Sequence, residues 1–433
     1  MPNLPLLRVL LCLPLAVMAT GCPMSGDGAC PEPETRFSLS CAEPIPGCSV
    51  EPMVAGSLGA LEVSSDAVEV LVWQGGLLRI SADGIGGVEV QRFTRSLSAP
   101  EPPLSLLPSV AGTLHPVVRA FALHDGAAVV VLEQERDSGV LRLVSLRLGP
   151  DGHPVGPLRV LWEGLHAGSG TPVLEGGVDP SHQVLVLALG TADGDGGQRR
   201  FHLVRADLRG SHAPLVRELP LPPTAQTVPA GVALTREGSV LVAGIDRQGL
   251  AGTLWFDHLN ADLEVVETLW TLEQEMAPRS THLIPSADGS SAAFGWFMPS
   301  AGEGLLAGLH RLEGIGPDLE PTRIDIWMGS FFGPVDGGDV DQALAFDRGQ
   351  LVQVSLELGP EGVGSGGLLG FLRMDAGNTA FNPWGLQAPL RIPAGDPQLR
   401  VMRLPNAGLL ASVPLLEDDG SHTLGLFRIC LPL

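Results

Sequence analysis

The sequence predicts an all-β fold, a β-propeller built most simply from seven four-stranded blades. Short apolar segments recur seven times along the chain, roughly 50–60 residues apart, a period typical of one blade. Turns rich in Gly and Asp precede most of these segments, as two-residue hairpin turns require. One such unit is too small to bury both of its faces, so the units are expected to stack around a common axis.

The best-formed copy of the unit covers residues 228–270. Apolar residues alternate with polar ones in four runs, which predicts strands at 231–235, 239–244, 253–260 and 265–270. The turns between these runs contain Gly, Ala and Asp. This stretch therefore sets the register in which the other copies are aligned.

Two markers recur in phase through the alignment. The first is the apolar core of the second strand of each unit, predicted at residues 68–73, 128–132, 184–189, 240–244, 292–296, 351–355 and 409–413. The second lies near the end of the third strand, at Arg79, Arg147, Arg205, Asn260, Arg311, Arg373 and Arg428. Because the best-formed copy has Asn there, the alignment argues against an arginine ring as a binding site.

The run VLVAG at 240–244 and the later LWFDHLNAD at 254–262 resemble the degenerate propeller repeats of bacterial surface proteins. The resemblance extends over residues 55–430, and it lacks the Trp-Asp and kelch signatures. After the predicted strands at 409–415 and 422–431 the chain lacks one strand of its seventh unit. We expect an N-terminal strand, either 36–40 or 48–54, to close the ring.

The composition limits the classes of partner. The chain of 433 residues carries a formal net charge of −22, and every basic residue in it is Arg. So acidic a chain disfavours nucleic acid, because contacts with phosphate supply most non-specific affinity. It contains no GxSxG, HExxH or P-loop motif. No catalytic residue, cofactor or metal is therefore assigned from the sequence.

The first residues indicate export. Arg8 is followed by an apolar run at 9–18 that is too short to span a bilayer, and small residues precede Cys22. The run Ala19-Thr20-Gly21-Cys22 resembles the lipobox of bacterial lipoproteins. This resemblance implies a signal peptide at 1–21, a lipid on Cys22 and, with Pro23 rather than Asp next, the outer membrane. The alternative is ordinary cleavage and a secreted or periplasmic protein.

The predicted domains are a tether and closing segment at 22–50 and a propeller at 51–433. Of the six cysteines, one lies in the signal and Cys22 is expected to carry lipid. The remaining four are an even number in an oxidising compartment, which predicts two disulfides among Cys30, Cys41, Cys48 and Cys430. Three connectivities are open, and a bond from Cys430 to Cys41 or Cys48 would join the two ends of the ring.

The predicted second-to-third loops are acidic, and in a propeller these loops share one face. A carboxylate-rich face could attract a cationic ligand, or it could serve solubility alone. The residues of this acidic loop face are Glu135, Asp137, Asp193, Asp195, Asp246, Glu303 and Asp418.

These observations predict a monomeric, envelope-anchored propeller lipoprotein that works as a binding or scaffold module. Its membrane contact is the lipid anchor, and a protein or polysaccharide partner would meet the loop face. The alternative function is a propeller hydrolase or lyase that acts on an extracytoplasmic polymer.

Overall fold

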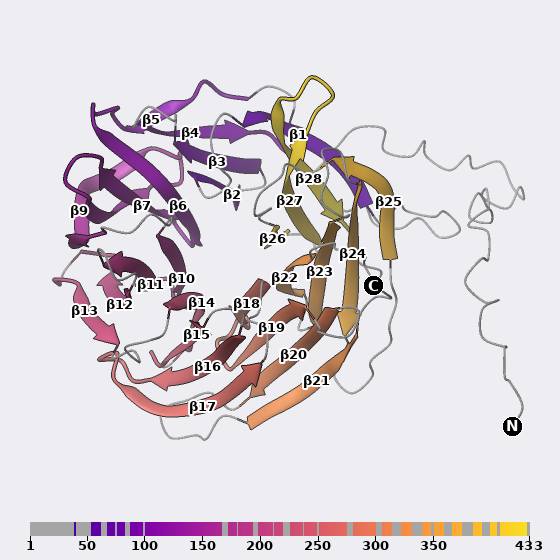
Figure 1. Ribbon diagram of the computed structural model, residues 1–433. Helices are drawn as coiled ribbons and strands as arrows, with labels where there is room; N and C mark the ends of the chain where they lie inside the picture. The colour runs from indigo at the N-terminus through magenta and orange to yellow at the C-terminus, as the bar shows by residue number, and fades with distance from the viewer. Residues whose placement is uncertain are drawn as a thin grey trace, which may run out of the picture.

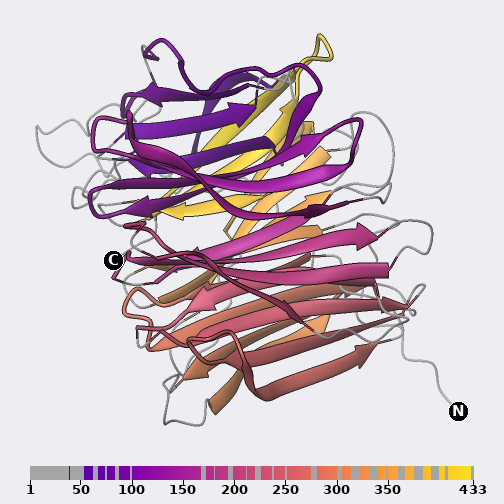
Figure 2. The ribbon, with the colours of Figure 1, turned by 90° about the vertical axis from the view of Figure 1, so that its left-hand side faces the viewer.

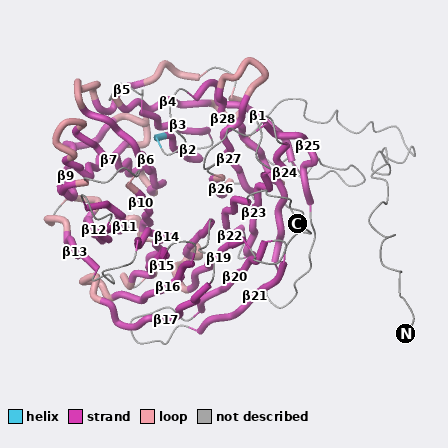
Figure 3. Tube along the Cα trace, viewed as in Figure 1, coloured by secondary structure: helices cyan, strands magenta, loops and turns pink. Residues whose placement is uncertain are grey.

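The structure is a computed structural model. It describes Leu39 and residues 53–61, 67–73, 76–82, 87–97, 100–166, 172–179, 181–193, 198–210, 212–219, 226–236, 238–248, 251–274, 280–299, 305–313, 322–330, 340–347, 350–358, 366–374, 384–391, 399–404 and 408–430. Strands make up most of these residues, as Figure 3 shows. Within the same ranges no helix is long and apolar enough to cross a membrane.

The described strands form seven four-stranded antiparallel sheets, which we number along the chain. Sheet 1 contains β2 (Val68–Trp73), β3 (Gly76–Ala82), β4 (Val88–Phe93) and β5 (Leu104–Leu107). Sheet 2 contains β6 (Thr113–Leu123), β7 (Gly126–Glu135), β8 (Val140–Leu148) and β9 (Pro154–Leu165). Sheet 3 contains β10 (Val173–Val178), β11 (Val184–Asp193), β12 (Gln198–Asp207) and β13 (Leu215–Leu219).

The next three sheets repeat this order. Sheet 4 contains β14 (Gln226–Leu234), β15 (Val240–Gln248), β16 (Ala251–Leu259) and β17 (Val265–Gln274). Sheet 5 contains β18 (Ser280–Pro285), β19 (Ser291–Pro299), β20 (Leu305–Glu313) and β21 (Thr322–Ser330). Sheet 6 contains β22 (Val340–Asp347), β23 (Gln350–Leu358), β24 (Gly366–Met374) and β25 (Trp384–Arg391).

Sheet 7 is assembled from both ends of the chain. Its C-terminal part contains β26 (Arg400–Arg403), β27 (Leu409–Leu416) and β28 (His422–Ile429). Its fourth strand is β1 (Met53–Leu61), which pairs antiparallel with β28. An N-terminal strand thus completes the last sheet, as predicted, although it runs from Met53 rather than over 36–40 or 48–54.

The sheets surround a common centre as a β-propeller, which confirms the predicted all-β fold (Figure 1). The first strands of successive sheets contact one another all the way round, from β2 through β6, β10, β14, β18 and β22 to β26, and β26 contacts β2. Figure 2 looks at the rim, where the outer strands lie.

Packing between neighbouring sheets provides the core. Buried apolar residues in the described ranges form seven clusters, each between two successive sheets. Between sheets 4 and 5, for example, Phe256 packs against Phe294 with ring centroids 5.5 Å apart. The cluster between sheets 7 and 1 joins Leu426 of β28 to Leu77 of β3. Burial of apolar area in these clusters is the main force that holds one sheet on the next.

Six of the seven predicted second-strand cores lie on second strands, and one prediction was wrong. Residues 68–73 form the innermost strand of sheet 1, so Arg79 lies on its second strand, β3, rather than on the third. The reason is the position of β1. Because β1 belongs to sheet 7, sheet 1 must take all four of its strands from residue 68 onward.

The best-formed unit has the predicted four strands, β14 to β17. Predicted first-to-second turns also have the expected backbone. Gly238, Gly289 and Gly408 have φ of +86°, +67° and +101°, a region that residues with a Cβ rarely adopt.

Candidate functional site

Part of the predicted acidic loop face is exposed on second-to-third turns. Glu135 and Asp137 lie at the β7–β8 turn of sheet 2, and Asp418 lies at the β27–β28 turn of sheet 7. All three side chains are exposed. The hydroxyl of Ser138 donates to the Glu135 carboxylate. These turns therefore present carboxylates to solvent.

Asp246 differs from the other described acids of this set. Its Oδ1 accepts hydrogen bonds from the Thr227 hydroxyl and from Trp255 Nε1, the latter at 3.1 Å. The carboxylate thus ties β14, β15 and β16 of one sheet together and is only partly exposed. This contact assigns Asp246 a structural role in sheet 4.

The remaining predicted site residues are described only in part or not at all. Asp193 ends β11, and its side chain lies outside the described residues, as do Asp195 and Glu303. Cys22, Cys30, Cys41 and Cys48 also lie outside them. Cys430 follows β28 and is half-buried.

A second group of ionisable side chains, which sequence reasoning missed, lies on the innermost strands. We call it the axial cluster, and it consists of Glu69 on β2, Arg119 on β6, Glu175 on β10, His282 on β18 and Arg400 on β26. Each residue stands opposite a residue of its sheet's second strand, for example Arg119 opposite Val130 and Arg400 opposite Ser412. The propeller thus repeats one inner position and places an ionisable group there in five sheets.

Glu69 is the most buried acid of the axial cluster, with 8% of its surface exposed. Burial raises the pKa of its carboxyl above the ordinary value of 4.5. The positive charges of Arg400 and Arg119 oppose this rise in pKa, while the negative charge of Glu175 adds to it. The pKa of Glu69 therefore depends on charges in the two neighbouring sheets, 7 and 2, and in sheet 3.

Arg119 is held in place by backbone carbonyls. It is 6% exposed; its Nε donates to the carbonyl of Leu174 on β10 at 3.1 Å, and its Nη1 donates to Val118 O at 2.9 Å. A buried guanidinium needs such acceptors, because an unsatisfied charged donor is costly. These bonds fix the guanidinium between the inner strands of sheets 2 and 3.

His282 is held in its neutral form. Burial, with a smaller contribution from the charge of Arg400, lowers the pKa of its imidazole to about 4. Its Nδ1 accepts a hydrogen bond from the backbone N–H of Leu344 in the next sheet, at 3.0 Å. Since neutral imidazole carries one proton, this bond leaves the proton on Nε2.

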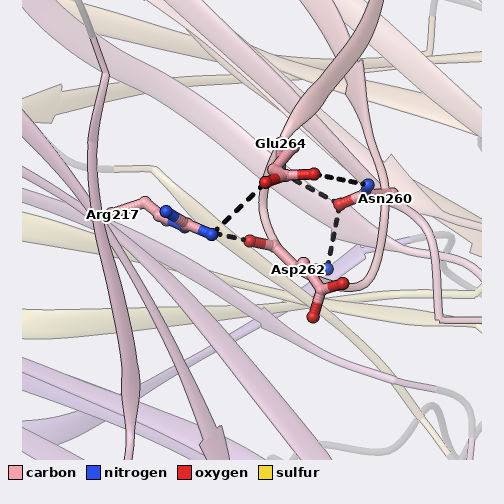
Figure 4. A network of polar contacts seen from close by, with 4 residues as sticks. All are labelled: Arg217, Asn260, Asp262 and Glu264. Carbon is pink, nitrogen blue, oxygen red and sulfur yellow. Dashed lines mark hydrogen bonds and ion pairs between the residues drawn. The ribbon is translucent and has the colours of Figure 1, made fainter.

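The arginines of the outer strands have a different role, which Figure 4 shows for sheets 3 and 4. Arg217 of β13 donates to Asp262 O at 3.3 Å and lies 3.4 Å from Glu264 Oε1, both in the β16–β17 turn. Asn260 orders that turn, because its Oδ1 accepts from the N–H groups of Asp262 and Glu264 at 2.9 and 3.0 Å.

The same kind of contact recurs at other sheet boundaries. Arg92 of sheet 1 donates to Asp151 O of sheet 2 at 3.0 Å, and Arg159 of sheet 2 donates to His212 O of sheet 3 at 2.9 Å. Arg205, one of the aligned marker residues, donates to Ala261 O of sheet 4. These arginines join neighbouring sheets through turn carbonyls.

Three histidines of the third strands, on β12, β16 and β20, have separate partners. His202 packs against Trp162 with ring centroids 4.8 Å apart, His258 Nδ1 lies 3.5 Å from Glu267, and His310 Nε2 accepts from Trp296 at 3.0 Å. Among the residues that the structure describes, no three His, Cys, Asp or Glu side chains could together hold a metal ion.

No protein-family model and no curated protein matches the sequence. Several solved structures are similar in fold. The polysaccharide lyase Uly1 is 9% identical with a TM-score of 0.48, over 85% of this chain and 90% of that one. An apocarotenoid oxygenase of Synechocystis is 13% identical (TM-score 0.43; 75% and 72% covered), and a Trypanosoma rangeli sialidase is 9% identical (0.41; 75% and 55%). At these identities the likeness concerns the fold alone.

Proposed function

We propose that this protein is an exported, lipid-anchored, seven-bladed propeller that binds a partner or serves as a scaffold in a bacterial envelope. The lipobox-like run before Cys22 supports the anchor and the outer-membrane location. Seven sheets and seven intersheet clusters support the count of seven blades. The partner is a protein or a polysaccharide that meets the acidic loop face.

The observation that carries this proposal is the exposure of carboxylates on the second-to-third turns. Glu135, Asp137 and Asp418 point into solvent from sheets 2 and 7, which lie on either side of sheet 1 in the ring. Clustered charge of one sign raises the rate at which an oppositely charged surface associates. A basic patch on an envelope protein, or a cationic polysaccharide, has the chemistry that this face would recognise.

A capture experiment with envelope extracts tests this assignment. Residues 23–433 are immobilised as wild type and as the triple variant Glu135→Gln, Asp137→Asn, Asp418→Asn. The control carries Asp151→Asn and Asp262→Asn, which are exposed acids on third-to-fourth turns and so belong to the opposite face. We expect a partner that the wild type and the control retain and the triple variant loses. Equal capture by all three would contradict the proposal.

A polymer hydrolase or lyase is the second candidate function. It is favoured by one observation, the burial-raised pKa of Glu69 with Glu175 in electrostatic range, because paired carboxyls in unlike environments can act as acid and base. The test is a panel of extracytoplasmic polysaccharides, monitored for new reducing ends and for absorbance of unsaturated products. Release of either by the wild type but not by Glu69→Gln would establish the enzyme.

A further inference from the structure

Two histidines join the first-to-second turns of sheets 2 and 3. His124 lies between β6 and β7, and His182 lies between β10 and β11. Their rings stack, with centroids 3.9 Å apart and an angle of 3° between the ring planes. His124 is exposed and His182 is half-buried, so solvent reaches the pair. We call this contact the histidine stack, and it lies on the propeller face opposite the acidic loop face.

The backbone of its own turn holds His182 in place. Its φ of +57° lies in the left-handed region, which is uncommon for residues other than Gly. The His182 N–H donates to Asp179 O at 2.8 Å, and the Asp179 carboxylate accepts from the N–H groups of Ser181 and Gln183 at 3.2 and 2.7 Å. None of these bonds uses the imidazole ring. The ring can therefore be replaced without removing the bonds that order the turn.

The surroundings of His182 disfavour a second proton on its ring. Its Nδ1 is buried, and no described residue forms a hydrogen bond with that atom. Neutral imidazole tolerates this with its proton on Nε2, whereas imidazolium would carry an unsatisfied charged donor at Nδ1. Protonation of both rings would also place two positive charges in the stack, where they repel each other. The histidine stack therefore suits neutral rings.

The charged groups around the histidine stack do not compensate these costs. Burial lowers the pKa of His182 below its ordinary value of 6.5, and the charge of His124 lowers this pKa further. Asp179 and Asp125 act in the opposite direction, but each already has partners. Asp179 accepts from the turn N–H groups, and Asp125 accepts from Arg147 Nη2 at 2.9 and 3.0 Å. The net effect on the pKa of His182 is a decrease.

We propose that the histidine stack is a pH-sensitive contact between sheets 2 and 3, made when the rings are neutral and broken when both are protonated. Imidazole changes its charge between about pH 5 and 8, so mild acid is sufficient. The core cluster between these sheets consists of apolar residues that do not titrate, among them Leu123 next to His124. The sheets therefore stay packed while the two turns separate. This contact does not involve the acidic loop face, so either proposal can fail without the other.

An NMR titration of the histidine ring protons tests the inference. The variants His124→Asn and His182→Asn assign the signals, and Asn tolerates the positive φ at position 182. We expect the pKa of His182 to lie below 6.5 in the wild type and to rise toward 6.5 in His124→Asn. His153→Asn, which removes an exposed histidine from the β8–β9 turn on the same face, should leave it unchanged. The same pKa of His182 in the wild type and in His124→Asn would contradict the inference.

Two further measurements follow the contact itself. In the wild type, nuclear Overhauser effects between the rings of His124 and His182 should be present at pH 7.5 and lost at pH 5. In a double-mutant cycle of His124→Asn and His182→Asn, the coupling free energy should be favourable at pH 7.5 and absent or reversed at pH 5. Circular dichroism verifies that each variant is folded. Ring contacts that persist at pH 5, or the same coupling at both pH values, would overturn the inference.

Discussion

The charge of Arg400 acts on the carboxyl of Glu69 across the boundary where the last sheet meets the first. β26 and β2 are the innermost strands of those two sheets, and they come from opposite ends of the chain. The contact between these two strands closes the ring, together with the apolar cluster between sheets 7 and 1.

Glu69→Gln should change how stability depends on pH. Because the folded-state pKa of Glu69 is raised above 4.5, its contribution to stability is fully present below about pH 4.5 and is lost as pH rises through the folded-state value. Each unit of that rise corresponds to about 1.4 kcal/mol. Urea unfolding from pH 4.5 to 8 should show a flatter profile for Glu69→Gln than for the wild type. Superimposable profiles would contradict the raised pKa.

His282→Leu should also change how stability depends on pH, but here the wild type loses stability as pH falls. The folded-state pKa of His282 is lowered to about 4, so its contribution to stability is present above about pH 6.5 and is lost as pH falls toward 4. The Leu variant also leaves the Leu344 N–H without its acceptor, which should cost about 1–3 kcal/mol at pH 7. Chemical unfolding at pH 7.5 and 4.5 measures both effects. His422→Gln, on the exposed part of β28, is the control. If His282→Leu loses no more stability than His422→Gln, this role of His282 is refuted.

Asn260→Ala should loosen the β16–β17 turn. The substitution removes the side-chain oxygen that accepts from two backbone N–H groups, at a cost of about 1–2 kcal/mol in the free energy of unfolding. Asp262→Asn in the same turn should change stability by less than about 0.5 kcal/mol, because Asp262 contacts Arg217 through its backbone carbonyl. Thermal unfolding of both variants checks the difference, and equal melting temperatures would show that Asn260 does not order the turn.

Cys430 is predicted to form a disulfide with Cys41 or Cys48. Under oxidising conditions Cys430→Ser should be less stable than the wild type, by about 6 kcal/mol on the chain-entropy model for so long a loop. Reduction should remove most of this difference. Non-reducing peptide mapping identifies the partner, and a Cys430 peptide found as a free thiol or joined to another chain would refute the pairing.

Cys22 is predicted to carry the lipid. Cells that express the full chain and are labelled with an alkyne fatty acid should yield a labelled, membrane-bound product. Cys22→Ala should yield an unlabelled product, and Cys12→Ala, which lies within the predicted signal, should not reduce labelling. Soluble, unlabelled wild-type protein would instead support ordinary signal cleavage.

The repeat was predictable from the sequence because apolar alternation and Gly-containing turns are local signals. They located β14 to β17 and six of the second strands. Which sheet a strand joins is a non-local property. No local pattern within residues 53–61 predicts pairing with β28. Because of that one pairing, residues 68–73 form a first strand rather than the predicted second strand.

The axial cluster was missed for a related reason. Glu69 within Val68–Trp73 fits the polar position of an ordinary half-exposed strand, and only the closed ring brings that position near charged groups of three other sheets. A signal did exist. Arg119, Glu175, His282 and Arg400 all stand opposite second-strand residues, so an alignment of first strands would have placed these ionisable groups together. Asp246 is the opposite case. The sequence predicts an exposed loop acid, but its carboxylate accepts hydrogen bonds within its own sheet.

Sheet 7 combines β1 with the three C-terminal strands, and this determines the order in which the sheets can form. β28 pairs with β1, so the last sheet can form only after nearly the whole chain has been synthesised, while sheets 1 to 6 contain only strands that follow one another in sequence. Until then β1 has an unpaired edge, and the ring remains an open arc. Folding of the ring is therefore completed only after β28 has left the ribosome and, in an exported protein, has crossed the membrane. A chain shortened before His422 would lack β28, which is the strand that pairs with β1.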